Sequence, residues 1–142
     1  MPSKPIIRGS AGVVLMLAAA AASTPAPPAS TEPDVPVTVS QARVDAARKT
    51  YELLASDYRL GWLPWSEPVY RWSRRWLEAE RDLASRDEER LAAVKAHLQR
   101  MRELDRITQA RFRRRDTTVD ESTAVQYFRL EAEAWVYQAS HH

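Results

Sequence analysis

The chain has 142 residues, no cysteine and a formal net charge of +2. Without cysteine, disulfide bonds, a lipoprotein anchor and a thiol nucleophile are all excluded, so stability has to come from packing or assembly. Both excess charges lie in the first eight residues, at Lys4 and Arg8, which no acid accompanies. The rest of the chain is neutral and lacks the excess of cations that non-specific nucleic-acid binding needs.

Residues 1–22 have the pattern of a secretory signal peptide. Lys4 and Arg8 precede an apolar run that ends in small residues, with Ala20 and Ala22 at the spacing of a cleavage site. We expect cleavage after Ala22, with a cut after Ala26 as the alternative. Because the run is shorter than the ~20 residues that span a bilayer, an uncleaved anchor is the less favoured interpretation. The predicted location is therefore periplasmic or secreted.

Residues 23–37 are predicted to be a disordered linker. Proline, alanine, serine and acidic residues at this density cannot bury enough apolar surface to fold. Beyond Pro68 the chain has no proline, and Gly61 is the only glycine after the predicted signal peptide. Because this part is also rich in Ala, Leu, Glu and Arg, residues 38–140 are predicted to be helical.

The first two helices are predicted from their ends and from the spacing of their apolar residues. The first has candidate N-caps at Thr38 and Ser40 and ends at Gly61, which can take the left-handed conformation. Ser66 caps the second, with Pro68 in its first turn. Both apolar stripes step 3-4-3-4: Val44, Ala47, Tyr51, Leu54 and Tyr58, then Val69, Trp72, Trp76, Ala79 and Leu83.

Two capping boxes, Ser85 with Glu88 and Thr118 with Glu121, predict the starts of two further helices. The apolar stripe changes phase at Ser85, so we favour a break there over one long helix. The third stripe is Leu91, Val94, Leu98, Met101, Leu104 and Ile107, and the fourth is Val125, Phe128, Ala132, Trp135 and Ala139. Short connections imply antiparallel neighbours, so the predicted fold is an all-α antiparallel bundle of three to four helices.

The second half of the chain repeats features of the first. Leu77-Glu78-Ala79-Glu80 matches Leu130-Glu131-Ala132-Glu133 at an offset of 53 residues, and Tyr58-Arg59 matches Phe112-Arg113 at an offset of 54. Two related helical hairpins are therefore predicted, because one such hairpin cannot cover its own apolar face.

This repeat resembles the helical-hairpin tip of TolC-like outer-membrane efflux proteins. It is more similar still to small uncharacterised secreted helical proteins of planctomycete-type bacteria, over about residues 44–138. The resemblance implies hairpin geometry alone. A TolC-like protomer is several times longer and contributes β-strands, and Arg115 stands here where the first hairpin has Gly61, so channel function is not carried over.

The five tryptophans divide into two groups. Trp72, Trp76 and Trp135 lie on the predicted apolar stripes, and we expect them in the core. Trp62 and Trp65 lie in a predicted turn, which has no core face, so they either cover the end of the bundle or form a contact patch.

Arginines accompany the tryptophans. Together with Trp62 and Trp65, the nearby Arg71 and Arg75 are the candidate partner-contact residues. For Arg71, Arg74 and Arg75, ordinary surface ion pairs are favoured over ligand binding. For the second cluster, 111–115, a favourable interaction with a helix C-terminus is favoured in the same way.

The sequence contains no recognisable pattern for catalysis or metal binding. The pairs Glu78/Glu80 and Glu131/Glu133 are two residues apart, which places the carboxylates on different sides of a helix. His97 has no His or Glu four residues away, and no phosphate-binding loop or nucleophile motif is found. We therefore predict no enzymatic activity, no metal site and no cofactor.

The predicted function is that of an exported, non-enzymatic helical binding or assembly protein of the cell envelope. A protein partner or self-association is expected, with no nucleic-acid partner and no stable membrane span after signal cleavage. The alternative is a periplasmic stress chaperone or metal-stress sensor of the small helical-hairpin type. A purely structural, self-associating coiled coil is a third possibility that the stripes permit.

Overall fold

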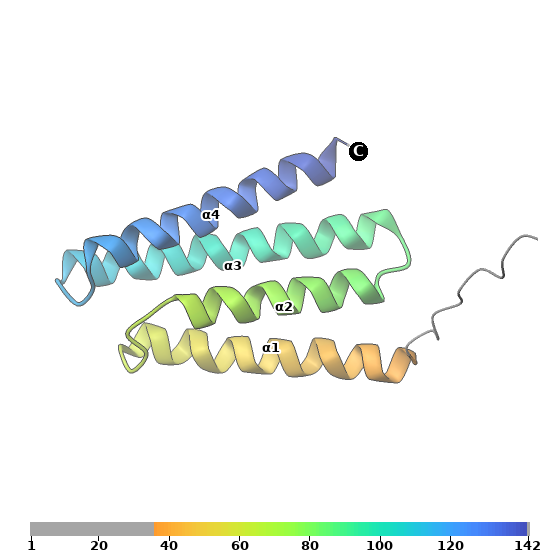
Figure 1. Ribbon diagram of the computed structural model, residues 1–142, viewed down its shortest axis with the longest axis horizontal. Helices are drawn as coiled ribbons and strands as arrows, with labels where there is room; N and C mark the ends of the chain where they lie inside the picture. Colours follow the sequence, from red (N-terminus) through yellow and green to blue (C-terminus); the bar gives the residue numbers. More distant parts are fainter. Residues whose placement is uncertain (1–35, 142) are drawn as a thin grey trace, which may run out of the picture. The chain divides into compact units, whose positions relative to one another are not determined.

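The computed structural model describes residues 36–141, so the predicted signal peptide and most of the predicted linker lie outside the described residues. Within 36–141 the chain forms four helices and no strand (Figure 1). They are α1 Val37–Leu60, α2 Glu67–Leu83, α3 Asp87–Arg113 and α4 Val119–Ser140. The predicted all-α bundle is confirmed, and the chain does break between α2 and α3.

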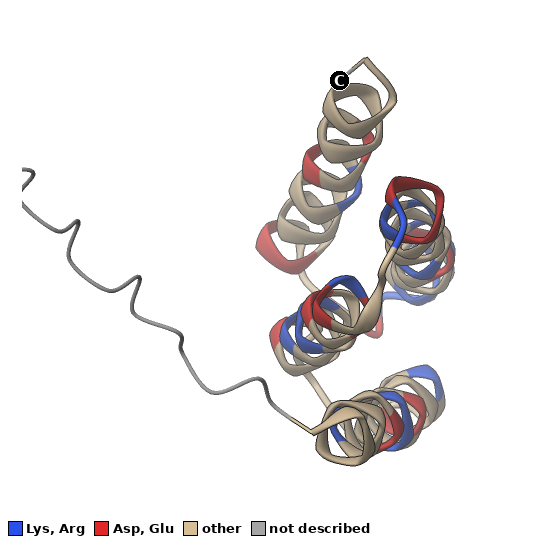
Figure 2. Ribbon diagram, turned by 90° about the vertical axis from the view of Figure 1, so that its right-hand side faces the viewer, with Lys and Arg blue, Asp and Glu red and all other residues tan. Residues whose placement is uncertain are grey.

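The helices pack in chain order as two antiparallel hairpins. α1 packs along α2 and α3 along α4, and the α2–α3 contact joins the two pairs (Figure 1). Seen along their axes, α1 and α4 lie on opposite sides of α2 and α3 (Figure 2). Each outer helix therefore has a broad face that no other described helix covers.

The main core lies between the four helices. Its buried residues are Tyr58, Val69, Leu98, Met101, Leu104, Ile107, Val125 and Ala132. A smaller cluster of Leu77, Ala93 and Val94 packs against Trp135. Burial of one such large apolar side chain contributes about 1.5–3 kcal/mol, so the stripe of α3, which supplies half of the main core, is the largest single source of stability.

Two helix starts differ from the prediction by a few residues. α1 begins directly after Pro36, whose carbonyl accepts the N–H groups of Val39 and Ser40, so neither Thr38 nor Ser40 is its N-cap. The proline ring fixes φ near the helical value, which allows the helix to start there. At α3, Glu89 rather than Glu88 reaches back to the preceding backbone and accepts the N–H of Ser85 at 3.0 Å.

The tryptophans predicted to lie in the core are only partly buried. α2 buries Val69, Ser73, Leu77 and Ala79, so its buried face is rotated away from Trp72 and Trp76. The flat indole rings lie at the edges of the packed face, where guanidinium groups cover them. Arg75 lies 4.6 Å from the ring centre of Trp72. Arg100 lies 4.0 Å from that of Trp76. Trp135 is also partly buried.

Candidate binding surface at the two turns

The α1–α2 turn and the α3–α4 turn lie at the same end of the helices (Figure 1). Four large apolar side chains there are open to solvent: Trp62 is 76% exposed, Leu60 57%, Trp65 54% and Phe112 39%. Exposed arginines from 113 to 115 accompany them. We call the surface formed by these seven residues the tip.

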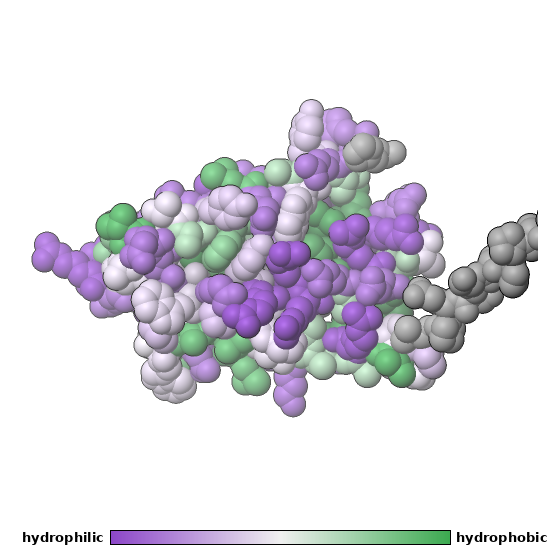
Figure 3. All heavy atoms as spheres, in the orientation of Figure 1, coloured by the Kyte–Doolittle hydropathy of each residue, from purple (hydrophilic) through white to green (hydrophobic). Residues whose placement is uncertain are grey.

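The tip keeps its tryptophans outside the core. Leu63 is the residue of the α1–α2 turn that packs against the core, whereas Trp62 and Trp65 on either side of it are exposed. Of the two roles open to these tryptophans, the geometry thus favours a contact patch over a cover for the bundle end. Figure 3 shows strongly polar and apolar side chains next to one another at this end.

Both turns reverse the chain in the same way. The N–H of Trp62 donates to the carbonyl of Asp57 at 2.9 Å, and the N–H of Asp116 donates to that of Arg111 at 2.9 Å. The residues before them, Gly61 and Arg115, have φ of +82° and +61°. This is the Schellman arrangement, in which a left-handed residue closes the helix and satisfies its last carbonyls. The turns are therefore short and backbone-bonded.

Positive charge dominates the tip. Arg114 pairs with Asp116 at 2.9 Å. Within residues 36–141, Arg113 and Arg115 form no ion pair. A depression of ≈ 330 Å³ joins the two turns, and its lining holds three guanidinium groups and one carboxylate: Arg59, Leu60, Gly61, Arg111, Arg114 and Asp116. An anion approaching the tip therefore meets a positive potential.

The buried side chain of Arg111 bonds to the backbone of both turns. Its side chain is only 4% exposed. One terminal nitrogen donates to the carbonyl oxygens of Tyr58 at 3.1 Å and Leu63 at 3.2 Å. The other donates to the carbonyl oxygen of Asp116 at 3.2 Å, and the guanidinium lies 4.4 Å from the ring centre of Tyr58. One residue of α3 thus fixes the backbone of both turns.

A second buried link involves Glu121, the predicted capping-box residue. Thr118 is the N-cap of α4, but Glu121 does not reach back to it. Its carboxylate accepts the Ser66 N–H at 2.5 Å and the Tyr58 hydroxyl at 3.2 Å. That hydroxyl also lies 2.9 Å from the Thr108 hydroxyl. The predicted capping box was wrong here, because Glu121 bonds Ser66 at the start of α2 and Tyr58 in the last turn of α1 instead.

These buried groups affect titration at Tyr58. Burial raises the pKa of the Tyr58 hydroxyl, because the phenolate is poorly solvated there, and the hydrogen bond between Tyr58 and Thr108 lowers it in part. The Tyr58 hydroxyl therefore keeps its proton to a higher pH than an exposed tyrosine does.

Sequence reasoning missed that Arg111 and Glu121 are buried and link different helices. Arg111 continues the buried spacing of α3 after Leu104 and Thr108, at a position the apolar stripe placed inside. The sequence did contain a signal for this, a charged residue at a position on the buried stripe. The prediction overlooked it because residues 111–115 were interpreted together as one basic cluster.

The two predicted arginines lie on α2, where each has a partner on its own helix. Arg71 lies on the exposed side of α2 and pairs with Glu67. Arg75, one turn further along, stacks over Trp72. No hydrogen bond or ion pair in the described part of the chain joins either residue to Trp62 or Trp65. The α3–α4 turn brings further exposed arginines, at 113 to 115, to the same end of the bundle (Figure 1).

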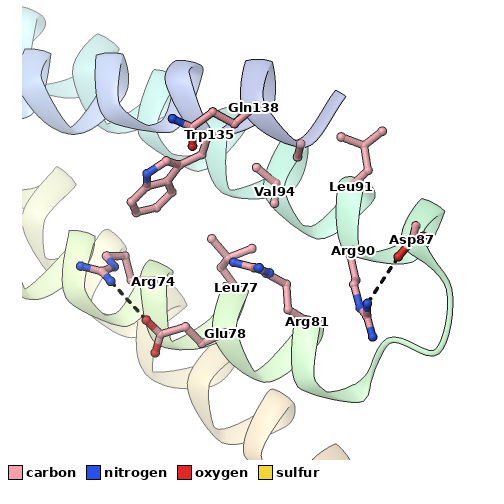
Figure 4. A pocket seen from close by; sticks show the side chains of 11 residues that line it. Arg74, Leu77, Glu78, Arg81, Asp87, Arg90, Leu91, Val94, Trp135 and Gln138 are labelled. Carbon is pink, nitrogen blue, oxygen red and sulfur yellow. Dashed lines mark hydrogen bonds and ion pairs between the residues drawn. The ribbon is translucent and has the colours of Figure 1, made fainter. Parts of the chain in front are cut away.

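A larger groove of ≈ 610 Å³ lies between α2, α3 and the end of α4 (Figure 4). Leu77, Val94 and Trp135 form its apolar wall. The arginines at its rim are mostly neutralised, because Arg74 pairs with Glu78 at 3.3 Å and Arg90 with Asp87 at 3.3 Å. The groove thus presents no set of free polar groups converging on one point.

Beneath this groove, Ser73 and His97 join α2 to α3. The Ser73 hydroxyl lies 2.8 Å from Nδ1 of His97 and accepts Nε of Arg100 at 2.7 Å. Burial, together with the charges of Arg100 and Arg74, lowers the pKa of His97 to about 3. Both Ser73 and His97 are fully buried, so this pair is closed to a substrate in the present structure.

In the part of the chain that the structure describes, no three His, Asp or Glu side chains are placed to hold a metal ion. None of the described helices is both long enough and apolar enough to cross a membrane. Comparison of the chain with protein-family models, curated proteins and solved structures finds no match in any of the three. Function is therefore inferred from the geometry of the tip.

Proposed function

We propose that this chain is an exported, non-enzymatic binding protein of the cell envelope that attaches to an anionic membrane surface through the tip. One observation supports the proposal: two exposed indole rings and a group of exposed guanidiniums occupy the same end of the bundle, on two turns that Arg111 holds together. The signal-peptide pattern of residues 1–22 supports export.

The chemistry of the tip suits a lipid surface. Tryptophan is favoured at the headgroup level of a bilayer, because its ring is largely apolar and its N–H is polar. One guanidinium group can donate to two oxygens of the same phosphate. Each Arg near an anionic membrane surface contributes about 1 kcal/mol to the binding free energy. Arg113 and Arg115 would thus supply roughly 2 kcal/mol, and partial burial of Trp62 and Trp65 a similar amount.

The rigidity of the tip also favours attachment to a surface. Because the two turns are already fixed by backbone hydrogen bonds and by Arg111, little conformational entropy is lost when the tip meets a surface. Attachment of this kind is peripheral and reversible. It departs from the protein partner expected from the sequence, because local sequence patterns do not reveal that the α1–α2 turn and the arginine-rich α3–α4 turn share one end of the bundle (Figure 1).

Vesicle sedimentation tests the proposal. Protein purified from cells expressing the full chain is mixed with vesicles of phosphatidylglycerol and phosphatidylcholine, or of phosphatidylcholine alone. We expect binding to the anionic vesicles only, weakening between low and high salt because exposed charges are screened. Binding should shift the tryptophan emission to shorter wavelength as Trp62 and Trp65 leave water.

Two variants and a matched control locate the contact. Replacing Trp62 and Trp65 by alanine, or Arg113 and Arg115 by serine, should reduce binding at least tenfold while the far-UV circular dichroism is unchanged. The control, Arg71→Ser with Arg75→Ser, removes the same charge from the exposed side of α2 and should bind normally.

Three results would contradict the proposal. Equal loss in the control would show that net charge rather than the tip governs binding. Loss of helicity in the tryptophan variant would make Trp62 and Trp65 core residues. Absence of vesicle binding, together with crosslinking of Trp62 to a protein in intact cells, would replace the membrane by a protein partner.

A further inference from the structure

α4 carries a second apolar stripe on the side that faces away from the core. Tyr127, Leu130, Ala134 and Tyr137 follow the 3-4-3 spacing of one helix face. Tyr127 is 62% exposed, Leu130 54% and Tyr137 67%. Single exposed apolar residues are ordinary on a protein surface, but a continuous row of them marks an interaction surface.

This face of α4 also lacks charge. Between 123 and 140 the only charged residues are Arg129, Glu131 and Glu133, all partly buried. Arg129 pairs with Asp105 of α3 at 2.9 Å and with Glu133 at 2.9 Å. Glu131 accepts the hydroxyl of Tyr70 of α2. All three are directed along the flanks or toward the neighbouring helices.

Figure 2 shows α4 mostly in tan, the colour of uncharged residues. By contrast, every exposed position of α2 is charged: Glu67, Arg71, Arg74, Arg75, Glu78, Arg81 and Asp82. Depletion of charge and enrichment of tyrosine distinguish the centre of protein interfaces from the rest of the surface.

We propose that α4 packs antiparallel against α4 of a second copy of this chain. The stripe reads Tyr-Leu-Ala-Tyr, and its four positions along the helix are symmetric about the level of residue 132. In an antiparallel pair that crosses there, Tyr127 lies opposite Tyr137 of the second copy, and Leu130 lies opposite Ala134. Each contact occurs twice, as a two-fold interface requires, and a large side chain faces a small one at the centre.

The helix dipole favours the antiparallel direction, because an antiparallel pair places the positive end of one α4 beside the negative end of the other. Asp120 is exposed in the first turn of α4. A parallel pair would place the two copies of Asp120 together, whereas an antiparallel pair keeps them at opposite ends.

The other outer helix fits a second copy less well. The exposed row of α1 contains Leu53, which is 60% exposed, but Lys49 lies within that row. The α4 stripe spans about 27 Å from 123 to 141. A single helix pair of this length buries less than the ~800 Å² per partner of a standard interface, so the dimer should be weak and dependent on concentration.

Sedimentation equilibrium of the purified protein across micromolar to millimolar concentrations tests the pairing in solution without lipid, so it is independent of the function proposed for the tip. We expect a monomer–dimer equilibrium, with Leu130→Glu raising the dissociation constant at least tenfold. Leu53→Glu is the matched control, a leucine of similar exposure on α1, and should leave it unchanged. A monomer at all concentrations, or loss of the dimer in the Leu53 variant alone, would overturn the proposal.

Introduced cysteines then report the register, because the chain has no cysteine of its own. When Leu130→Cys and Ala134→Cys proteins are mixed and oxidised, the mixed disulfide should form in preference to either homodimer. Ala92→Cys, on the exposed side of α3, should remain unlinked. Preferential pairing of Leu130→Cys with itself would indicate a parallel interface and refute the antiparallel one.

Discussion

Replacing Arg111 by methionine tests whether one side chain supports the tip. Methionine keeps much of the volume but removes three hydrogen bonds to backbone carbonyls. The Tyr58 carbonyl keeps the N–H of Gly61 at 3.1 Å as a partner. The carbonyls of Leu63 and Asp116 lose the one partner that the structure gives them. At about 1–2 kcal/mol for each carbonyl left unpaired, the expected loss of unfolding free energy is about 2–4 kcal/mol.

Thermal unfolding followed by circular dichroism measures this loss. For about 100 ordered residues, 1 kcal/mol shifts Tm by roughly 4 °C, so the Arg111→Met variant should melt about 8–16 °C lower. Arg113→Met, two residues along the same helix but exposed, should change stability by no more than about 0.5 kcal/mol. Equal shifts in the two variants would show that Arg111 acts only through its charge at the helix end, and would refute the bracing role.

Two further predictions concern buried and strained positions. Because the fold lowers the pKa of His97 to about 3, the unfolded chain, with an ordinary value of 6.5, binds more protons between these limits. The free energy of unfolding should therefore fall as pH drops from about 6.5 toward 3. Urea unfolding at several pH values measures this fall. It should be shallower in the His97→Gln variant than in the original protein, and unchanged in His141→Gln. At the two left-handed positions, Gly61→Ala should lower stability by about 1 kcal/mol through backbone strain alone, since nothing lies within 4 Å of the added methyl. Arg115→Gly should raise stability by about 0.5–1 kcal/mol, so Tm shifts of the same sign in these two variants would contradict the strain argument.

The helical part of the fold could be predicted because its signals are local. Gly61 ends α1 in the left-handed conformation, as its lack of a side chain allows. The α3 stripe from Val94 to Ile107 is buried as its spacing predicted, because a face of one helix turns toward the core as a unit. The caps were less reliable. Pro36 starts α1, and Glu89 replaces Glu88, because several nearby residues can satisfy the same free N–H groups.

The candidate site could be predicted only in part. Trp62 and Trp65 were identified because a turn offers no face to bury them, and they are exposed. That Arg71 and Arg75 take part in the contact stays a prediction. Arg71 and Arg75 are close in sequence but belong to the side of α2, whereas Arg113 and Arg115 reach the same end only because α1 and α3 run in the same direction. Closeness in the sequence does not show which turns of the folded chain lie at the same end.

The sequence by itself determined that residues 38–140 are helical, in three to four helices, that the first of them ends at Gly61 and which side of α3 is apolar, since propensity, glycine and periodicity act within a few residues. Tertiary structure decided the rest. It assigned Arg111 and Glu121 to buried links between the turns, and it left the Tyr127–Tyr137 stripe of α4 uncovered. Those outcomes depend on which helices become neighbours, and hydrogen-bond partners 48 and 55 residues apart leave no local pattern in the chain.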